Sequence, residues 1–190
     1  LGLSHDDKRK IVLSVGLFFA RKGILDFIEL ARRNPEYIFV WLGNTNLSII
    51  PSKIRKAVLK FHPDNCLFPG YLNGSDLFGA YSDSDLFLFP SYEETEGIVV
   101  LEALASRQKL LVRDIPVYND WLYDGKNCYK ASSIDEFDDK LNLILHDQLP
   151  DLSDAGFATA ESRDVSKIGK KIKNAYQEAL SLFETKKGIQ

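Results

Sequence analysis

The chain has 190 residues, of which 45% are hydrophobic and 27% charged, and this balance fits one globular domain with a core of its own. The formal net charge of -3 and the pI near 5.7 give no general basic field, so nucleic acid is not an expected partner. No apolar run is long enough to span a bilayer and the first residues lack the pattern of a signal peptide, so we expect a soluble segment.

The two cysteines and the N-terminal residues suggest where the segment comes from. Cys66 and Cys128 each lie in an apolar run, and such a sparse pair predicts free thiols in a reducing, cytoplasmic setting. The sequence opens at Leu1 and its first residues are polar and charged. We interpret residues 1–9 as a linker from a preceding domain and the chain as a piece of a longer protein.

Short runs rich in β-branched and aromatic residues alternate with helical patterns over residues 10–150, which predicts buried parallel strands connected by helices. In chain order, the expected strands are Ile11–Val15, Tyr37–Leu42, Cys66–Phe68, Leu86–Phe89, Leu110–Val112 and Cys128–Tyr129. The expected helices are Lys22–Arg33, Pro51–Phe61, Asp76–Ser82, Gly97–Ser106, Val117–Leu122 and Ile134–His146. This alternation predicts an α/β fold: a doubly wound, Rossmann-like parallel sheet of about six strands, with helices on both faces.

Residues 151–190 are expected to form a C-terminal helical extension of the same domain. From Asp164 to Leu182, apolar residues recur at helical spacing, which predicts an amphipathic helix. We expect this helix to pack against the sheet layer or against a missing domain.

In a doubly wound sheet, ligands bind at the edge where the carboxyl ends of the strands meet the loops. In this chain, the loops at that edge are residues 16–23, 43–46, 69–72, 90–97 and 113–116. After the fifth expected strand, Asp114 and Tyr118 are candidates to line a site, although Tyr118 fits core packing better.

The most informative stretch is residues 90–107, PSYEETEGIVVLEALASR, which crosses an expected strand-to-helix junction. Gly97 lets the backbone approach a ligand, and the helix N–H groups that follow, at Ile98 and Val99, attract a diphosphate. Glu102 lies within this helix, where its carboxylate can accept hydrogen bonds from two ribose hydroxyls, and Glu94 precedes the helix. Taken alone, acidic residues such as Glu93, Glu94 and Glu96 before a helix are more typical of favourable pairing with the helix dipole.

The pattern P-S-x-x-E-x-x-G-x-x-x-x-E-A-x-A in this stretch resembles the signature of glycosyltransferase family four, whose members have the two-domain GT-B fold. The resemblance implies that Glu94 contacts a donor sugar, that Glu102 binds the ribose, and that the amides around Gly97 bind donor hydroxyls and phosphate. Many relatives have an aromatic residue where this chain has Glu96. A carboxylate there either alters sugar choice or faces solvent.

A second element, GLFFARKG at residues 16–23, directly follows the first expected strand. Its first glycine lets the loop run close to a phosphate and Lys22 adds positive charge, although Arg21 and Lys22 also fit an ordinary solvated turn. Members of the resembled family have a glycine, often followed by an arginine, and a lysine-glycine pair that grips the diphosphate. Gly16 and the lysine-glycine pair match, but Leu17 stands at the arginine position. The resemblance therefore implies Lys22 first, and Arg21 second, as phosphate contacts.

Residues 65–72, NCLFPGYL, are similar to the third strand and base-binding turn of that family. The resemblance implies that the backbone at Gly70, Tyr71 and Leu72 recognises the nucleobase. Without that context, a plain buried strand and turn explains the same residues.

Metal and cofactor sites are not expected. His5, His62 and His146 are scattered among expected linkers and helix ends, with no second ligand at metal spacing. The nucleotide-sugar implied by the resemblance is a substrate, so no cofactor is predicted.

Two runs, GLFFARKGILDFIELARRNPEYIFVWLG and RDIPVYNDWL, resemble bacterial enzymes that glycosylate diacylglycerol. The resemblance implies a retaining hexosyltransferase that moves glucose or galactose from a UDP-sugar to a glycolipid or other acceptor, with Glu94, Lys22 and Arg21 at the reacting centre. It also implies an acceptor domain before this chain. The whole enzyme would be cytoplasmic and peripheral, on the inner face of the cell membrane.

Two other functions remain open from the sequence. One is a nucleotide-binding module without catalysis, which would keep the cleft but lack the chemistry. The other is a sugar-nucleotide epimerase of the same two-domain architecture, which would convert its substrate without an acceptor. We expect this segment of a glycosyltransferase to transfer no sugar on its own, because the cleft lies between two domains.

Overall fold

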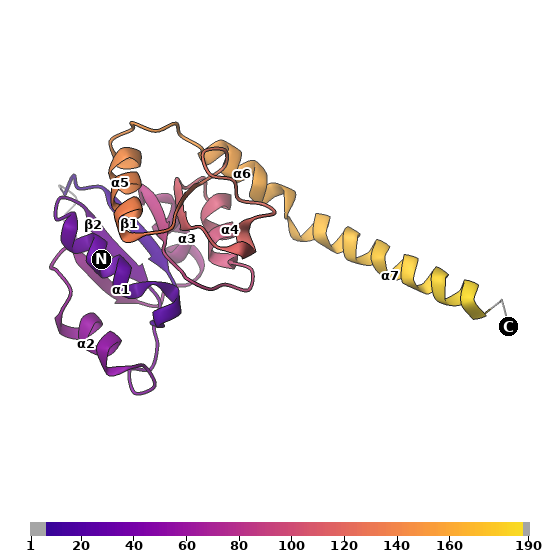
Figure 1. Cartoon of the computed structure of the whole chain (residues 1–190), viewed down its shortest axis with the longest axis horizontal. Coiled ribbons are helices and arrows are strands. Elements are labelled where there is room, and N and C mark those ends of the chain that lie inside the picture. The colour runs from indigo at the N-terminus through magenta and orange to yellow at the C-terminus, as the bar shows by residue number, and fades with distance from the viewer. Residues whose placement is uncertain (1–6, 188–190) are drawn as a thin grey trace.

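The computed structural model describes residues 7–187 and contains one α/β body with a long C-terminal helix (Figure 1). Its strands are β1 (Ile11–Val15), β2 (Ile38–Leu42), β3 (Cys66–Gly70), β4 (Leu86–Phe89), β5 (Leu110–Arg113) and β6 (Tyr129–Ala131). Its α-helices are α1 (Ile24–Arg33), α2 (Ser52–Lys60), α3 (Gly74–Ser82), α4 (Ile98–Ala105), α5 (Ile134–Leu145), α6 (Ser153–Ser162) and α7 (Val165–Lys187). Two short 3-10 helices are Ala20–Lys22 and Pro116–Tyr118. Most of the predicted linker, residues 1–9, lies outside the described residues.

All neighbouring strands are parallel, in the order β3-β2-β1-β4-β5-β6. This order, which is that of dinucleotide-binding folds, confirms the predicted doubly wound, Rossmann-like sheet of about six strands. The inner strand β2 is buried along its whole length, as expected for a strand covered by helices on both faces. At the edge of the sheet, β3 continues through Pro69, which lacks a ladder donor and is tolerated on an edge strand.

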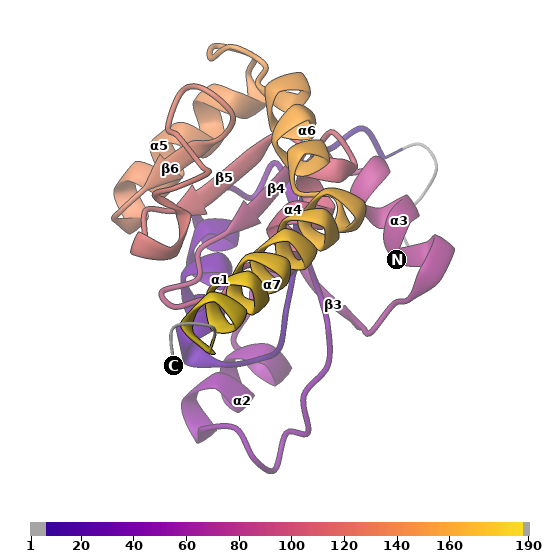
Figure 2. The same ribbon diagram turned by 90° about the vertical axis from the view of Figure 1, so that its right-hand side faces the viewer.

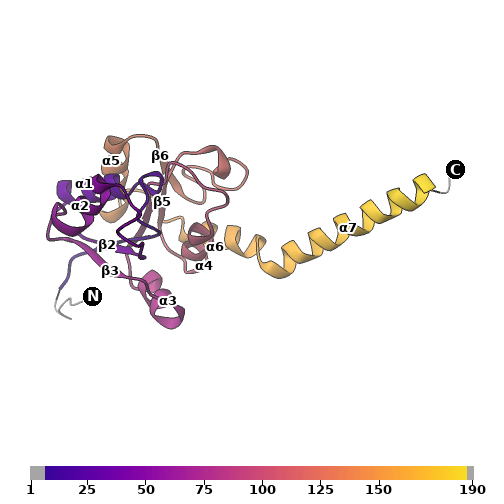
Figure 3. The same ribbon diagram turned by 90° about the horizontal axis from the view of Figure 1, so that it is seen from below.

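Helices cover both faces of the sheet (Figures 2 and 3). On one face, α1, α2 and α5 pack their apolar residues on alternate strand residues such as Val12, Phe39 and Trp41. On the other face, α3 and α4 pack on the intervening residues such as Leu13 and Phe87. Two separate cores therefore hold the sheet, and its carboxyl edge stays open for the loops.

One expected helix is wrong. Residues 117–122 form only the 3-10 turn Pro116–Tyr118 and further turns, although Tyr118, Trp121 and Leu122 are buried as a helix face would be. The amide of Asn127 holds the chain in this turn, since it donates to the Trp121 carbonyl and accepts from the Tyr123 N–H. The apolar spacing came from a packed turn, not from a helix.

The C-terminal helix α7 extends away from the body (Figures 1 and 3). Its side chains are exposed from Val165 to Phe183, except that Ile168 is half-buried. The expectation that it packs against the sheet layer is therefore wrong, because α6 and the turn before α7 direct it outward. Within residues 7–187, no helix combines the length and apolar character needed to cross a membrane.

Candidate functional site

Two loops that follow neighbouring strands meet at the carboxyl edge of the sheet. Strands β1 and β4 are paired, so residues 16–23 after β1 and residues 90–97 after β4 lie side by side. The Tyr92 N–H donates to the Arg21 carbonyl at 2.7 Å, and the Ser91 hydroxyl oxygen lies 3.1 Å from the same carbonyl. Hydrogen bonds within the chain thus fix one loop to the other.

This arrangement brings together Lys22 and Glu94, which are the two residues predicted from separate motifs. The Lys22 ammonium donates to both carboxylate oxygens of Glu94, at 2.6 and 2.7 Å. Only 15% of the Lys22 side chain and 6% of the Glu94 side chain are exposed. The Ser91 hydroxyl donates to Glu94 as well, at 2.6 Å. A nearly buried, charge-assisted pair therefore lies where the diphosphate and sugar are expected.

A buried guanidinium, that of Arg113 at the end of β5, connects the loop after β4 to α1 and to the segment after β6. It pairs with Asp26 of α1 at 2.5 Å and donates to the carbonyls of Pro90 at 3.1 Å and Ser132 at 2.9 Å. Its Cζ atom also lies 3.8 Å from the centre of the Tyr92 ring. Only 7% of the Arg113 side chain is exposed, so this arginine is a buried anchor for the loop that carries Glu94.

Two glycines permit the close approach of these segments. Gly23 has φ 74°, and a Cβ there would lie well inside van der Waals distance of the Pro90 carbonyl. Gly97 has φ 82° and is the N-cap of α4, where a Cβ would come within 3.0 Å of the Tyr118 ring and hydroxyl. Because any other residue would strain both turns, the sequence places its glycines where the loops need them.

The remaining predicted residues of the first loop lie near the pair in different ways. Arg21 is exposed, and its guanidinium donates to the Glu93 carbonyl at 3.1 Å. Gly16 is held at the start of the loop, since its carbonyl accepts from the Trp41 indole at 2.8 Å. Leu17 is exposed and apolar. Arg21 is therefore the second cation beside the pair, and its replacement of the missing arginine stays a prediction.

The structure does not bring Glu102 into the same hollow as Lys22 and Glu94. Glu102 lies one turn inside α4, as predicted, and accepts from the Tyr81 hydroxyl of α3 at 2.9 Å. It lines a hollow of about 580 Å³ between α4, α6 and the start of α7. Lys22 and Glu94 line a smaller hollow of about 230 Å³, and Ile98 lines both. The two carboxylates thus lie on either side of the first turn of α4.

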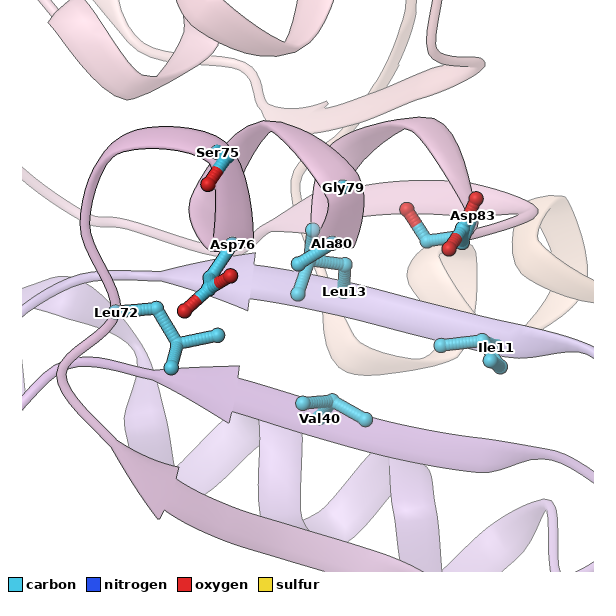
Figure 4. A pocket seen from close by; sticks show the side chains of 10 residues that line it. Ile11, Leu13, Val40, Leu72, Ser75, Asp76, Gly79, Ala80 and Asp83 are labelled. Carbon is cyan, nitrogen blue, oxygen red and sulfur yellow. The ribbon is translucent and has the colours of Figure 1, made fainter. Parts of the chain in front are cut away.

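The predicted base-binding residues lie at a third place. Gly70 ends β3 with φ 98°, and its carbonyl accepts from the Gly43 N–H at 2.8 Å. Tyr71 is exposed. Leu72 lines a hollow of about 350 Å³ between α3 and strands β1 and β2, with Asp76 beside it (Figure 4). The wall formed by Leu72 is apolar and the rim is acidic.

The two candidates after β5 do not reach an open site. Asp114 pairs with Lys130 at 3.0 Å. Tyr118 is fully buried, and among the described residues its hydroxyl has no hydrogen-bond partner. Burial raises the pKa of this phenol strongly, and the charge of Glu94 adds to the rise. Tyr118 therefore packs behind the Gly97 turn.

The histidines have structural surroundings. The ring of His62 lies edge-on to Phe68 at 5.3 Å, and that of His146 lies near Tyr37 at 6.2 Å. His5 is outside the described residues. In the part of the chain from residue 7 to residue 187, no three His, Cys, Asp or Glu side chains gather in a way that could hold a metal ion.

A family profile, glycosyl transferases group 1, matches residues 2–165. The chain belongs to this family. The resemblance read from residues 90–107 is thus confirmed, and the chain is a glycosyltransferase domain.

Two curated relatives of this glycosyltransferase domain have names that refer to diacylglycerol or to a glycosylated diacylglycerol. The processive diacylglycerol alpha-glucosyltransferase of Acholeplasma laidlawii is 43% identical over 177 residues, which cover 93% of this chain and 53% of the relative. The alpha-galactosylglucosyldiacylglycerol synthase of Streptococcus pneumoniae is 35% identical over 120 residues, covering 62% of this chain and 32% of the relative. The chain spans about half the length of the first relative and a third of the second.

Solved structures agree on the fold. A sucrose-phosphate synthase from Thermosynechococcus elongatus superposes with a TM-score of 0.82 at 19% identity, covering 93% of this chain and 47% of that one. The Anabaena protein HepE, solved in complex with UDP and glucose, superposes with a TM-score of 0.76 at 16% identity, covering 92% and 53%. At these identities the likeness shows the GT-B type of domain and no more.

Sequence reasoning missed two polar residues of this glycosyltransferase domain. Arg113 was noted only as the start of a loop, although a charged residue that ends an otherwise apolar buried strand is itself a signal of internal pairing. Tyr81 was counted within a helix, and no local pattern connects it to Glu102. Both residues act on predicted site residues from elements far away in the chain.

Proposed function

We propose that this chain is the donor-binding half of a retaining glycosyltransferase that moves glucose or galactose from a UDP-sugar to a glycolipid acceptor. The observation that carries the proposal is the Lys22–Glu94 pair at the carboxyl edge of the sheet, next to the N-terminus of α4. A cation for a diphosphate and a carboxylate for sugar hydroxyls are the groups that such a donor needs. The relatives named above, which act on diacylglycerol lipids, support the acceptor class.

The chemistry follows from the charges around the pair. As the sugar leaves, negative charge grows on the diphosphate, and Lys22 with Arg21 would stabilise it. The first N–H groups of α4, at Ile98 and Val99, have no partner within the helix and would bind the same phosphates. Glu94 would hold sugar hydroxyls rather than act as a nucleophile. With these charges supplied by the chain, we propose that no bound metal or cofactor takes part.

Glu102 is suited to the ribose. Its carboxylate is oriented by the Tyr81 hydroxyl, whose pKa is raised strongly by burial and further by the charge of Glu102. A neutral phenol donates one hydrogen bond to the carboxylate and leaves the other oxygen for ligand hydroxyls. The backbone of Gly70, Tyr71 and Leu72 would then take the base.

The acceptor would bind to a second domain, because this chain spans only 53% of its relative. Helix α7 offers that domain a surface: Ile172, Tyr176 and Leu180 are exposed at a spacing that places them on one helix face. We further propose that the whole enzyme lies on the cytoplasmic side of the cell membrane, where nucleotide-sugars and a diacylglycerol acceptor can meet.

Calorimetric titration of the 190-residue chain with UDP-glucose and UDP-galactose tests the donor site. Lys22→Ala and Glu102→Ala should each weaken binding about tenfold or more, since each removes a charged hydrogen bond to the ligand. Lys53→Ala and Glu36→Ala remove exposed charges elsewhere and should leave binding unchanged. Equal binding by all four variants, or no binding by the unaltered chain, would exclude the proposed donor site.

The reaction itself needs the full-length protein. Hexose transfer from the preferred UDP-sugar to diacylglycerol in vesicles is expected, with the anomeric configuration of the donor retained in the product. Conversion of the UDP-sugar in the absence of vesicles would instead identify an epimerase.

A further inference from the structure

The Lys22–Glu94 contact occupies the hydrogen-bonding capacity that both residues need for a donor. The ammonium has three N–H groups, and two of them point to the carboxylate oxygens at 2.6 and 2.7 Å. Oxygen Oε1 of Glu94 also accepts from Ser91 at 2.6 Å. Each charged group is thus already paired with the other.

The low exposure of both side chains makes it costly in free energy to separate Lys22 from Glu94 and to give only one of them a new partner. The side chains of Lys22 and Glu94 are only 15% and 6% exposed, so water cannot fully replace a lost partner. The loop that carries Glu94 is fastened to Arg113 through Pro90, so the carboxylate cannot move far from its place. Opening the pair without a substitute therefore leaves a carboxylate with no cation.

A ligand can supply one substitute or two. A nucleoside diphosphate offers phosphate oxygens to Lys22, but nothing that donates to Glu94. A nucleotide-sugar offers the same phosphate oxygens and, in addition, sugar hydroxyls that donate to the freed carboxylate. Only the complete donor replaces both halves of the pair.

Resting on the proposed function, we propose that the Lys22–Glu94 pair is a selectivity device that makes the domain prefer a nucleoside diphosphate sugar to the nucleoside diphosphate that remains after transfer. The pair occupies the site in the empty domain and opens only when diphosphate and sugar arrive together. Once the sugar has been transferred, Lys22 pairs with Glu94 again. The remaining nucleoside diphosphate loses its contact with Lys22 and dissociates.

Glu94→Gln tests the device, because it keeps the shape and the acceptor for Ser91 but removes the charge that holds Lys22. Titration of the 190-residue chain should show UDP binding about tenfold tighter in this variant than in the unaltered chain, as expected when one charged hydrogen bond no longer has to be broken. UDP-glucose binding should not tighten, since the sugar loses its carboxylate. The preference of the domain for UDP-glucose over UDP, measured as the ratio of the two affinities, should therefore fall about tenfold or more.

Two controls separate the pair from a general charge effect. Glu93→Gln makes the same change of charge one residue away, on an exposed side chain, and should leave the ratio unchanged. In a Lys22→Ala background, Glu94→Gln should no longer tighten UDP binding, because there is no pair to open. Should Glu94→Gln fail to fold, Glu94→Asp withdraws the carboxylate by one methylene and should show the same gain.

The outcomes also distinguish this inference from the proposed function. If the chain binds UDP-glucose but Glu94→Gln and Glu93→Gln affect UDP equally, Lys22 serves Glu94 and the phosphates together, and the device does not exist. If no form of the chain binds UDP or UDP-glucose, the donor site itself is wrong.

Discussion

Two regions of this molecule, the loops after β1 and β4 and the helix α7, differ in what holds them in place. The loops after β1 and β4 are joined by the Tyr92 N–H to Arg21 carbonyl bond and by the Lys22–Glu94 pair, and Arg113 anchors the second loop through the Pro90 carbonyl. Helix α7 has a regular apolar stripe, yet its side chains lie in solvent. The difference shows that contacts within this chain hold the loops at the carboxyl edge of the sheet, whereas α7 gains little from packing on the body, in keeping with the proposal that it meets a second domain.

The largest effect on stability should come from replacing Arg113, which anchors the loop after β4. Arg113→Leu would leave the Asp26 carboxylate without its cation and two carbonyls without donors, at a cost of about 3 kcal/mol or more in the free energy of unfolding. Arg32→Leu removes an arginine whose ion pair with Glu29 is half exposed, and should cost less than about 1 kcal/mol. Urea titration measures both. Similar losses in the two variants would mean that Arg113 is not a special fixed point.

Arg113 also shows which part of the structure could not be predicted from the sequence. The strands and their order were predictable because each strand is a continuous apolar run and parallel sheets of this kind have few arrangements. Lys22, Glu94 and Gly97 were predictable as candidates because local motifs mark them. The partners of Arg113 lie on three other segments, and no local pattern connects them. The expected helix at 117–122 was wrong for a related reason. Elements far away in the chain bury apolar residues there, and the spacing of these residues resembles that of a helix face.

A smaller effect, of opposite sign in the two regions, is expected from replacing glycine by alanine. Gly23→Ala forces a Cβ against the Pro90 carbonyl at a positive φ, and should destabilise the body by about 2 kcal/mol. Gly169→Ala in α7 meets open space, and should stabilise that helix by up to about 1 kcal/mol. Thermal unfolding followed by circular dichroism at 222 nm reports both changes. A loss of stability in Gly169→Ala would show that α7 packs more closely on the body than its exposure indicates.

The smallest effect on stability, and a direct probe of the same contrast, is the reactivity of thiols. Burial raises the pKa of Cys66 and Cys128 from 9.0 to about 12, so at pH 8 only about one such thiol in ten thousand is the reactive thiolate. Tyr176→Cys places a third thiol on α7, at a position 70% exposed, where an ordinary pKa leaves roughly a tenth to a quarter as thiolate at this pH. This surface change should alter the free energy of unfolding by less than about 0.5 kcal/mol.

With Ellman's reagent at pH 8 we expect one fast equivalent from the variant and none from the unaltered chain until it is unfolded. Because a raised thiol pKa keeps the neutral form, raising the pH toward 10 should speed the α7 thiol first and leave the two buried ones slow. Fast reaction of Cys66 or Cys128 in the folded chain would mean that the two cores open far more often than their packing allows.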